Sequence, residues 1–204
     1  MVMLNWFVRD PTPVLSGPRV ILRAPRNRDY DSWRALRRDS REFLKPFEPR
    51  WTEADLNRQA FGARLVRGQA EARKGTDYSF LIFEKTPDGD EVLVGGLTIS
   101  NIRRRAAQFG SLGYWMGEQY AGRGLMSEAV GVMLPFFFGE LGLHRLQAAF
   151  LPHNTASRRV LEKNGFKEEG YAESYLQIDG KWADHVLFAL TRERWDARNK
   201  PAGR

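Results

Sequence analysis

Residues 108–141 restrict the possible folds of this chain more than any other stretch. A β-type run over residues 108–116 leads to Gln119-Tyr120-Ala121-Gly122-Arg123-Gly124, and an apolar helix is predicted to follow at once, from Leu125 to about Leu141. The start of a helix leaves about four backbone N–H groups without helical partners and presents the positive end of the helix dipole. Glycines at positions 122 and 124 let the backbone come close to a bulky anion. The stretch therefore predicts a phosphate-binding turn, although a glycine turn that merely begins a helix is the other interpretation.

Two common nucleotide-binding motifs do not match this turn. A dinucleotide-binding turn needs G-x-G-x-x-G and an acidic residue about twenty positions later, and here no third glycine follows in register. A P-loop needs Gly-Lys-Ser/Thr, whereas Leu125-Met126-Ser127 follows Gly124. Arg123, which lies between the two glycines, is expected to add a charged donor. The turn therefore predicts an anion-binding site that is neither a dinucleotide-binding turn nor a P-loop.

The remaining periodicities predict a single mixed α/β domain over residues 1–204, with a core at about residues 19–195 and a basic C-terminal tail. Strands and helices do not alternate regularly, which argues against a doubly wound fold. Asp29 is expected to cap the first helix, and Gly165 to end the last one. The predicted strands are residues 19–22, 78–84, 91–100, 108–116, 145–150, 173–178 and 184–190, and the predicted helices are residues 29–40, 53–73, 125–141 and 155–164.

Composition excludes several classes of function. The chain has no cysteine, so a disulfide framework, a thiolate metal site and a cysteine nucleophile are ruled out. Its three histidines are widely spaced, at positions 144, 153 and 185, and no metal is expected. The most apolar stretch, residues 130–138, is too short to cross a bilayer, so no membrane partner is expected and the predicted location is the cytoplasm. The net charge of +7 favours a polyanionic partner, such as a phosphate-bearing cofactor or a nucleic acid, although a solvated basic surface explains it equally well.

A second motif lies one predicted strand beyond the turn. Asn154 precedes the helix predicted at residues 155–164, and Gly165-Phe166 follows that helix. Together with Gln119-x-x-Gly122-x-Gly124, this motif resembles the Gcn5-related N-acetyltransferase (GNAT) family, whose cofactor loop reads Gln/Arg-x-x-Gly-x-Gly/Ala. The resemblance covers residues 19–195 and is narrower with the RimJ-type branch, the ribosomal-protein alanine N-acetyltransferases. The segments that carry the narrower resemblance are residues 43–49, 112–115, 122–126, 152–154, 169–172, 175–182 and 184–186.

The resemblance implies both a fold and a cofactor. The implied fold has a central, mostly antiparallel twisted sheet, helices on both faces and a splayed strand pair that holds acetyl-CoA. The implied reaction is direct attack of an amine on the thioester in a ternary complex, with which the absence of cysteine agrees. The residues expected to bind acetyl-CoA are Tyr114, Trp115, Met116, Gln119, Tyr120, Ala121, Gly122, Arg123, Gly124, Leu125, Met126, Asn154 and Ser157.

The resemblance also points to three residues with roles in catalysis. The backbone amide of Met116 would polarise the thioester carbonyl. Many relatives carry a tyrosine seven residues after the asparagine, but Leu161 takes that place here. In the branches that this chain resembles, a serine three residues after the asparagine is the proposed acid for the leaving thiolate, and the resemblance implies that role for Ser157. Glu48 lies in a loop rich in aromatic residues, where partial desolvation would make it a stronger base. Other roles stay open at this point: Asn154 as a helix cap, Ser157 as a helix-surface serine and Glu48 as an exposed carboxylate.

The acceptor implied by the resemblance is a protein N-terminal α-amine, the alanine N-terminus of a ribosomal protein, with RNA close to the basic clusters. An α-amine with a pKa near 7.8 is roughly 15% neutral at pH 7, whereas a lysine with a pKa near 10.4 is well under about 0.1% neutral. An N-terminus therefore needs a weaker base than a lysine does. Two other interpretations are an acetyltransferase of a small amine, such as an antibiotic or a polyamine, and an acetyl-CoA-binding module that contacts the ribosome or RNA with little catalysis.

Overall fold

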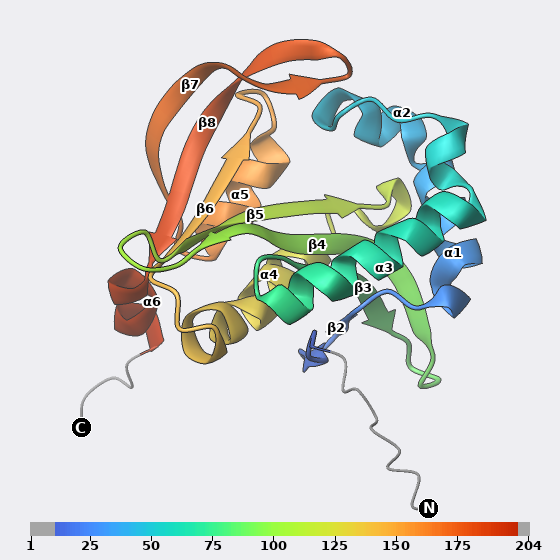
Figure 1. Cartoon of the computed structure of the whole chain (residues 1–204), viewed down its shortest axis with the longest axis horizontal. Coiled ribbons are helices and arrows are strands. Elements are labelled where there is room, and N and C mark those ends of the chain that lie inside the picture. Colours follow the sequence, from blue (N-terminus) through green and yellow to red (C-terminus); the bar gives the residue numbers. More distant parts are fainter. Residues whose placement is uncertain (1–10, 200–204) are drawn as a thin grey trace, which may run out of the picture.

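One mixed sheet of eight strands forms the centre of the protein (Figure 1). The computed structural model describes residues 11–199. The strands are β1 (Leu15–Ser16), β2 (Val20–Arg23), β3 (Tyr78–Lys85), β4 (Glu91–Arg103), β5 (Phe109–Met116), β6 (Arg145–Phe150), β7 (Lys167–Ile178) and β8 (Lys181–Thr191). Their order is β1-β2-β3-β4-β5-β6-β8-β7, and neighbours are antiparallel except for the parallel pair β5 and β6. The prediction of a mixed α/β fold with a mostly antiparallel sheet is confirmed.

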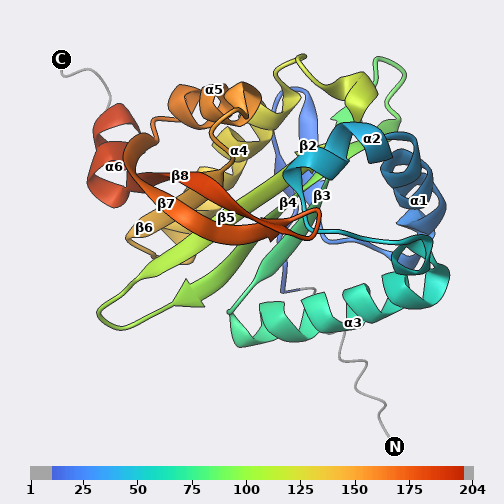
Figure 2. The same ribbon diagram turned by 90° about the horizontal axis from the view of Figure 1, so that it is seen from above.

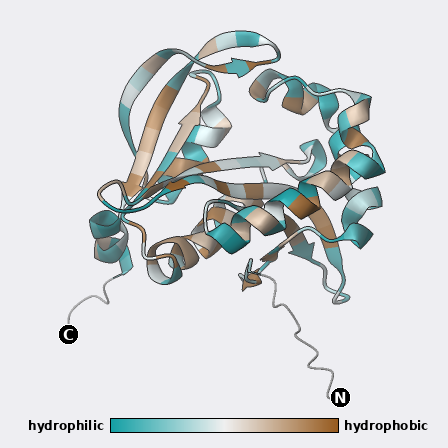
Figure 3. Cartoon of the chain, viewed as in Figure 1, coloured by the Kyte–Doolittle hydropathy of each residue, from teal (hydrophilic) through white to brown (hydrophobic). Residues whose placement is uncertain are grey.

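Helices cover both faces of this sheet, as Figure 2 shows. Within residues 11–199 they are α1 (Tyr30–Asp39), α2 (Arg41–Leu44), α3 (Arg58–Lys74), α4 (Leu125–Pro135), α5 (Thr155–Lys163) and α6 (Arg192–Asn199). Successive side chains of a strand point to opposite faces. Along β3, Phe80 and Ile82 accordingly pack in the core that contains α4, whereas Leu81 and Phe83 pack with α1 and α3. In Figure 3 the central strands carry brown, apolar stretches, while α6 is mostly teal and polar.

The parallel pair β5 and β6 separates soon after it begins. The two strands are paired over three positions, from Phe109 opposite Arg145 to Ser111 opposite Gln147. β5 then continues to Met116 and β6 to Phe150 without further pairing between them. The splayed strand pair expected for this fold is therefore present. Beyond Ser111, no described strand pairs with the edge of β5 that faces β6.

Two of the predicted helices differ from the expectation. Asp29 does not cap α1 with its side chain, because its carboxylate accepts hydrogen bonds from the Arg23 guanidinium and from the Arg26 backbone amide. The helix predicted over residues 53–73 is divided into a 3-10 turn (Glu53–Leu56) and α3. The division lies at Asn57, whose side chain accepts a hydrogen bond from the amide of Ala60 and caps α3.

The C-terminal half of the fold follows the prediction closely, with longer strands. β6 and α5 lie where they are predicted, and Gly165 follows α5 with a left-handed φ of 86°. The helix predicted over residues 125–141 is α4 followed by a wider, π-type turn (Phe136–Glu140). The basic tail expected after residue 195 begins within α6, and residues 1–10 and 200–204 of the predicted domain lie outside the described residues. None of the helices in residues 11–199 combines the length and the apolar character that a membrane span requires.

Candidate active site

The turn between β5 and α4 has the backbone that its glycines predict. Gly122 and Gly124 adopt left-handed φ angles of 76° and 79°, which residues with a side chain rarely adopt. Gly124 is the residue that caps α4, and because glycine has no side chain it provides no side-chain cap for the first amides of the helix. No heavy atom lies within 4 Å of the position that a Cβ on Gly122 would occupy. Free amides, the positive end of the helix dipole and open space therefore coincide at this turn.

Arg123, which the sequence predicts to add a charged donor to the anion site, has a carboxylate partner in the structure. Its guanidinium forms an ion pair of 2.6 Å with Glu84 on β3. Arg19 supports the turn from the other side: it donates to the carbonyl oxygen of Arg123 at 3.2 Å and pairs with Glu128 on α4 at 2.8 Å. Burial alone would raise the pKa of Glu128, but the hydrogen bonds and charge of Arg19 outweigh burial and hold that pKa below its ordinary value. Arg19 was missed because 109 residues separate it from Glu128.

The end of β5 lies beside a glycine pair that makes room for it. Gly96 on β4 is opposite Trp115, and a Cβ on Gly96 would come within 2.5 Å of the indole Nε1 of Trp115. Gly95 is opposite Met116, where a Cβ would collide with the backbone of Trp115. β4 therefore holds one edge of residues Tyr114 to Met116, and the other edge faces the gap between β5 and β6.

Two predicted site residues from distant segments meet across that gap. The phenolic oxygen of Tyr114 on β5 lies 2.7 Å from the Oγ of Ser157 on α5. Ser157 is 8% exposed, and its backbone amide donates to the Oδ1 of Asn154 at 3.0 Å. Asn154 is thus the cap of α5. Burial raises the pKa of Tyr114 to about 12, although the hydrogen bond to Ser157 acts in the opposite direction.

Glu48, the predicted base, is paired with an arginine. Its two oxygens accept hydrogen bonds of 2.9 and 2.6 Å from the guanidinium of Arg37, and one of them also accepts a bond from the indole of Trp51. The guanidinium lies between two rings, 5.0 Å from the centroid of Trp51 and 4.8 Å from that of Trp115. Both oxygens of the Glu48 carboxylate are therefore occupied by donors from α1 and from its own loop.

Arg37 was missed although the sequence carries a signal for it. It lies one helical turn from Trp33 and two turns from Tyr30, on the buried face of α1, and is itself 9% exposed. A charged residue at a buried helical position requires a partner of opposite charge. The partner could not be identified from spacing, because Glu48 follows a second helix and a 3-10 turn.

The turn of the β7–β8 hairpin rests on the loop that contains Glu48. The amide of Asp179 donates to the carbonyl oxygen of Glu48 at 3.0 Å, and Arg50 donates to the carbonyl oxygen of Asp179 at 3.1 Å. Figure 1 shows the hairpin arching from the β6 side of the sheet towards α2. The Tyr114–Ser157 pair and the Glu48 loop thus lie on two sides of the region that the hairpin bridges.

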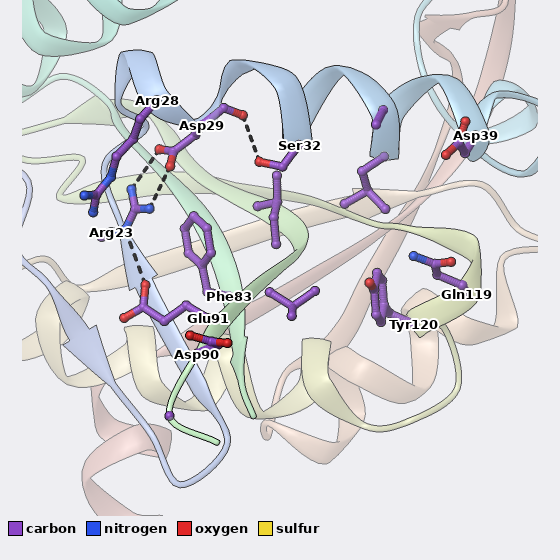
Figure 4. Close-up of a pocket in the computed structure, with 15 residues that line it drawn as sticks. Arg23, Arg28, Asp29, Ser32, Asp39, Phe83, Asp90, Glu91, Gln119 and Tyr120 are labelled. Atoms are coloured by element: carbon purple, nitrogen blue, oxygen red, sulfur yellow. Dashed lines mark hydrogen bonds and ion pairs between the residues drawn. The ribbon is translucent and has the colours of Figure 1, made fainter. Parts of the chain in front are cut away.

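An open pocket lies apart from most of the predicted site residues. It has a volume of about 800 Å³ and lies between α1 and the turn that joins β3 to β4 (Figure 4). Of the predicted residues, Gln119 and Tyr120 contribute to its lining. The ion pair between Arg23 and Asp29 occupies one end, with a distance of 2.7 Å. Its lining also contains Glu91, so this pocket carries charges of both signs.

The described residues contain no group of three or more histidine, aspartate or glutamate side chains that could hold a metal ion. The predicted residues that the structure brings together belong to the turn before α4, the free edge of β5 and the cap of α5. Glu48 lies with Arg37 instead.

Comparison with known sequences identifies relatives over most of the chain. The model of the acetyltransferase (GNAT) domain matches residues 19–167. The "[Ribosomal protein uS5]-alanine N-acetyltransferase" of Escherichia coli (strain K12) is 36% identical over 195 residues, which cover 95% of this chain and 98% of that enzyme. A second relative, "Probable N-acetyltransferase YjcK" of Bacillus subtilis, is 32% identical over 87% of this chain and 96% of its own length.

Solved structures resemble the fold over the same range. Mycobacterium smegmatis RimJ in complex with CoA-disulfide has a TM-score of 0.79 and 35% sequence identity, with 89% of this chain and 87% of that chain covered. Ribosomal-protein-S5-alanine acetyltransferase from Vibrio fischeri has a TM-score of 0.81 and 28% identity, with 90% and 98% covered. Structural relatives of this protein thus contain coenzyme A.

Proposed function

Because the chain belongs to the Gcn5-related N-acetyltransferase (GNAT) family and is an acetyl-CoA-dependent N-acetyltransferase, we propose that its acceptor is the alanine N-terminus of a ribosomal protein. The observation that carries this proposal is the 36% identity, over nearly the full length of both chains, to an enzyme whose name states that acceptor. Such an acceptor would place the reaction in the cytoplasm.

The proposed position of acetyl-CoA follows from the backbone and side-chain groups of the site that have hydrogen bonds still to make. The free edge of β5 at Tyr114 to Met116 offers backbone amides and carbonyls to the amides of an extended pantetheine arm. The left-handed turn at Gly122 and Gly124 offers unpaired amides to the pyrophosphate. The cap of α5 uses the oxygen of the Asn154 amide, so the amide nitrogen is the part of that side chain that would bind the arm.

The proposed reaction needs a carbonyl polariser and an acid. The Met116 amide would donate to the thioester oxygen as the acceptor nitrogen forms its bond to the carbonyl carbon. As the carbon–sulfur bond breaks, Ser157 would give its hydroxyl proton to the leaving sulfur. The proton that the amine loses passes to water, and a proton from water restores Ser157. The leaving thiol has a pKa of about 8.5, so the demand on this acid is modest.

The state of Glu48 supports an α-amine rather than a lysine as the acceptor. Its carboxylate is occupied by Arg37 at 2.6 and 2.9 Å, so the loop provides no free strong base. An α-amine with a pKa near 7.8 is roughly 15% neutral at pH 7 and needs none, whereas a lysine needs one.

Turnover on a matched panel of acceptors tests the proposal. The purified chain is incubated with acetyl-CoA and an alanine-led peptide that contains one lysine, with the same peptide blocked at its N-terminus, or with a polyamine or an aminoglycoside, while free thiol is followed. We expect thiol release with the free peptide and not with the other acceptors, and mass spectrometry should place the acetyl group on the first residue. Thiol release with the blocked peptide would contradict the proposal, and so would thiol release with the small amines but not with the free peptide. Acetyl-CoA binding without turnover on any acceptor would instead indicate a binding module.

A further inference from the structure

A single hydrogen bond connects the splayed strand β5 to the helix that carries Ser157. The Tyr114 hydroxyl reaches across to α5, 43 residues later in the chain, and meets the Oγ of Ser157 at 2.7 Å. The backbone carbonyl of the same serine is 3.4 Å away and is a weaker alternative acceptor. Ser157 is buried and Tyr114 is half-buried, so this bond is partly protected from competition with water.

The direction of this bond follows from the protons that are available. Burial raises the pKa of Tyr114 to about 12, so the phenol keeps its proton at neutral pH. Each hydroxyl has one proton to donate and two lone pairs that accept. The two acceptors in reach of the phenol, among the described residues, are both atoms of Ser157. If Ser157 donated to Tyr114 instead, the phenolic proton of Tyr114 could bond only to the carbonyl oxygen of Ser157, which is farther away at 3.4 Å. Donation by Tyr114 to the Oγ of Ser157 is therefore favoured.

The backbone of Ser157 is held from the opposite side. Its amide donates to the Oδ1 of Asn154 at 3.0 Å, which fixes the first turn of α5. With Oγ accepting from Tyr114, the hydroxyl proton of Ser157 is left without a described acceptor. That proton is therefore the one free to point towards a bound ligand between β5 and β6.

We propose that Tyr114 is a positioning residue that donates its hydrogen bond to Ser157 Oγ and thereby directs the Ser157 proton at the sulfur of the leaving coenzyme A. The inference rests on the proposed function, in which Ser157 is the acid. As the carbon–sulfur bond breaks, its electron pair goes to sulfur, the Ser157 proton forms the S–H bond, and negative charge develops on Oγ. The phenolic O–H of Tyr114 stabilises that charge until a proton from water restores the hydroxyl. A hydrogen bond to a charged group is stronger than one between neutral groups.

Tyr114→Phe removes the hydroxyl and keeps the ring, which makes it the direct test. We expect kcat to fall about 10- to 100-fold, the effect of one hydrogen bond to a developing charge, while the KM for acetyl-CoA changes less than about twofold. Tyr171→Phe is the matched control, because it also removes a tyrosine hydroxyl bond, the one of 2.6 Å to Asp184 on the exposed hairpin. The control should keep the activity of the parent chain, and circular dichroism should report the same fold for both variants.

A double-mutant cycle tests whether Tyr114 acts through Ser157, and the KM for acetyl-CoA together with the Tm distinguishes positioning from a merely structural role. If Tyr114 acts through Ser157, the double variant Tyr114→Phe/Ser157→Ala has the same kcat as Ser157→Ala alone. If the effects of the two substitutions on kcat multiply, Tyr114 acts independently of Ser157 and the inference is overturned. If the bond merely holds β5 to α5, Tyr114→Phe raises the KM for acetyl-CoA and lowers the Tm while kcat at saturation changes less than about twofold, and that result also overturns the inference while leaving the acid role intact. Full turnover by Ser157→Ala would overturn the acid role and this inference together. The acceptor panel is unaffected by either outcome, so the choice of acceptor is tested separately.

Discussion

Replacing Glu48 with glutamine separates a structural role of this carboxylate from a catalytic one. Glutamine has nearly the same shape but no charge, and its amide presents a donor where the guanidinium of Arg37 also presents donors. One of the two hydrogen bonds, of 2.6 and 2.9 Å, is therefore lost. The guanidinium stays between the Trp51 and Trp115 rings with its charge uncompensated.

The size of the effect follows from how deeply the pair is buried. Removal of one partner from a buried ion pair costs about 3–5 kcal/mol, because the other charge remains out of water. The side chains of Arg37 and Glu48 are 10% and 18% exposed, so water relieves part of that cost. We therefore expect Glu48→Gln to lower the free energy of unfolding by about 2–4 kcal/mol. For a chain of this length, that corresponds to a decrease in Tm of roughly 4–16 °C.

Urea and thermal unfolding, followed by circular dichroism, measure this loss. Glu53→Gln is the matched control, since Glu53 is 57% exposed and pairs with Arg41 at 3.2 Å. A surface pair of this kind contributes about 0–1 kcal/mol, so the control should unfold close to the parent chain. Arg37→Met should destabilise the chain as well, and the double variant with Glu48→Gln should lose less than the sum of the two single variants.

The reasoning is refuted if Glu48→Gln unfolds like the parent chain. In that case, a fall in kcat of about 10²- to 10⁴-fold, measured well below the Tm of the variant, would identify Glu48 as the base. We expect instead that kcat of the folded variant falls less than about tenfold. The shape of the pH–rate profile should then stay the same, because no titrating base has been removed.

Three further changes test other parts of the structure. Gly124→Ala places a side chain at a φ of 79°, so we expect a raised KM for acetyl-CoA, whereas Gly89→Ala, at a φ of 87° in the β3–β4 turn, should leave KM unchanged. Leu161→Ala empties a position with no exposed surface and should lower the free energy of unfolding by about 2–5 kcal/mol in urea titration. Burial alone would raise the pKa of Asp29, but hydrogen bonds from Arg23 and a backbone amide hold it below its ordinary value. The stabilisation that this carboxylate adds is therefore complete above about pH 4 and is lost as the pH falls further, so Asp29→Asn should destabilise the chain at pH 7 and much less at pH 3.

The parts of the site that depend on neighbours in the chain could be predicted from the sequence. The left-handed glycines at 122 and 124 lie directly before a helix, and Asn154 lies three residues before the amide that it caps. Gly165 likewise ends α5 because a left-handed residue is needed there. Each of these depends on the dihedral freedom of one residue or on a hydrogen bond within one helical turn. The order of strands and helices could be predicted for the related reason that hydrophobic periodicity is a local property.

The partners of charged and hydroxyl groups were decided by the tertiary structure alone. Arg123 pairs with Glu84, Arg19 with Glu128, and Tyr114 meets Ser157 across the gap between β5 and β6. These partners depend on strand register and on where β5 and β6 separate, and one residue of slip would turn each side chain to the other face. The same limit applies to Glu48, the predicted base: its loop is visible in the sequence, but the arginine that pairs with its carboxylate comes from the buried face of α1.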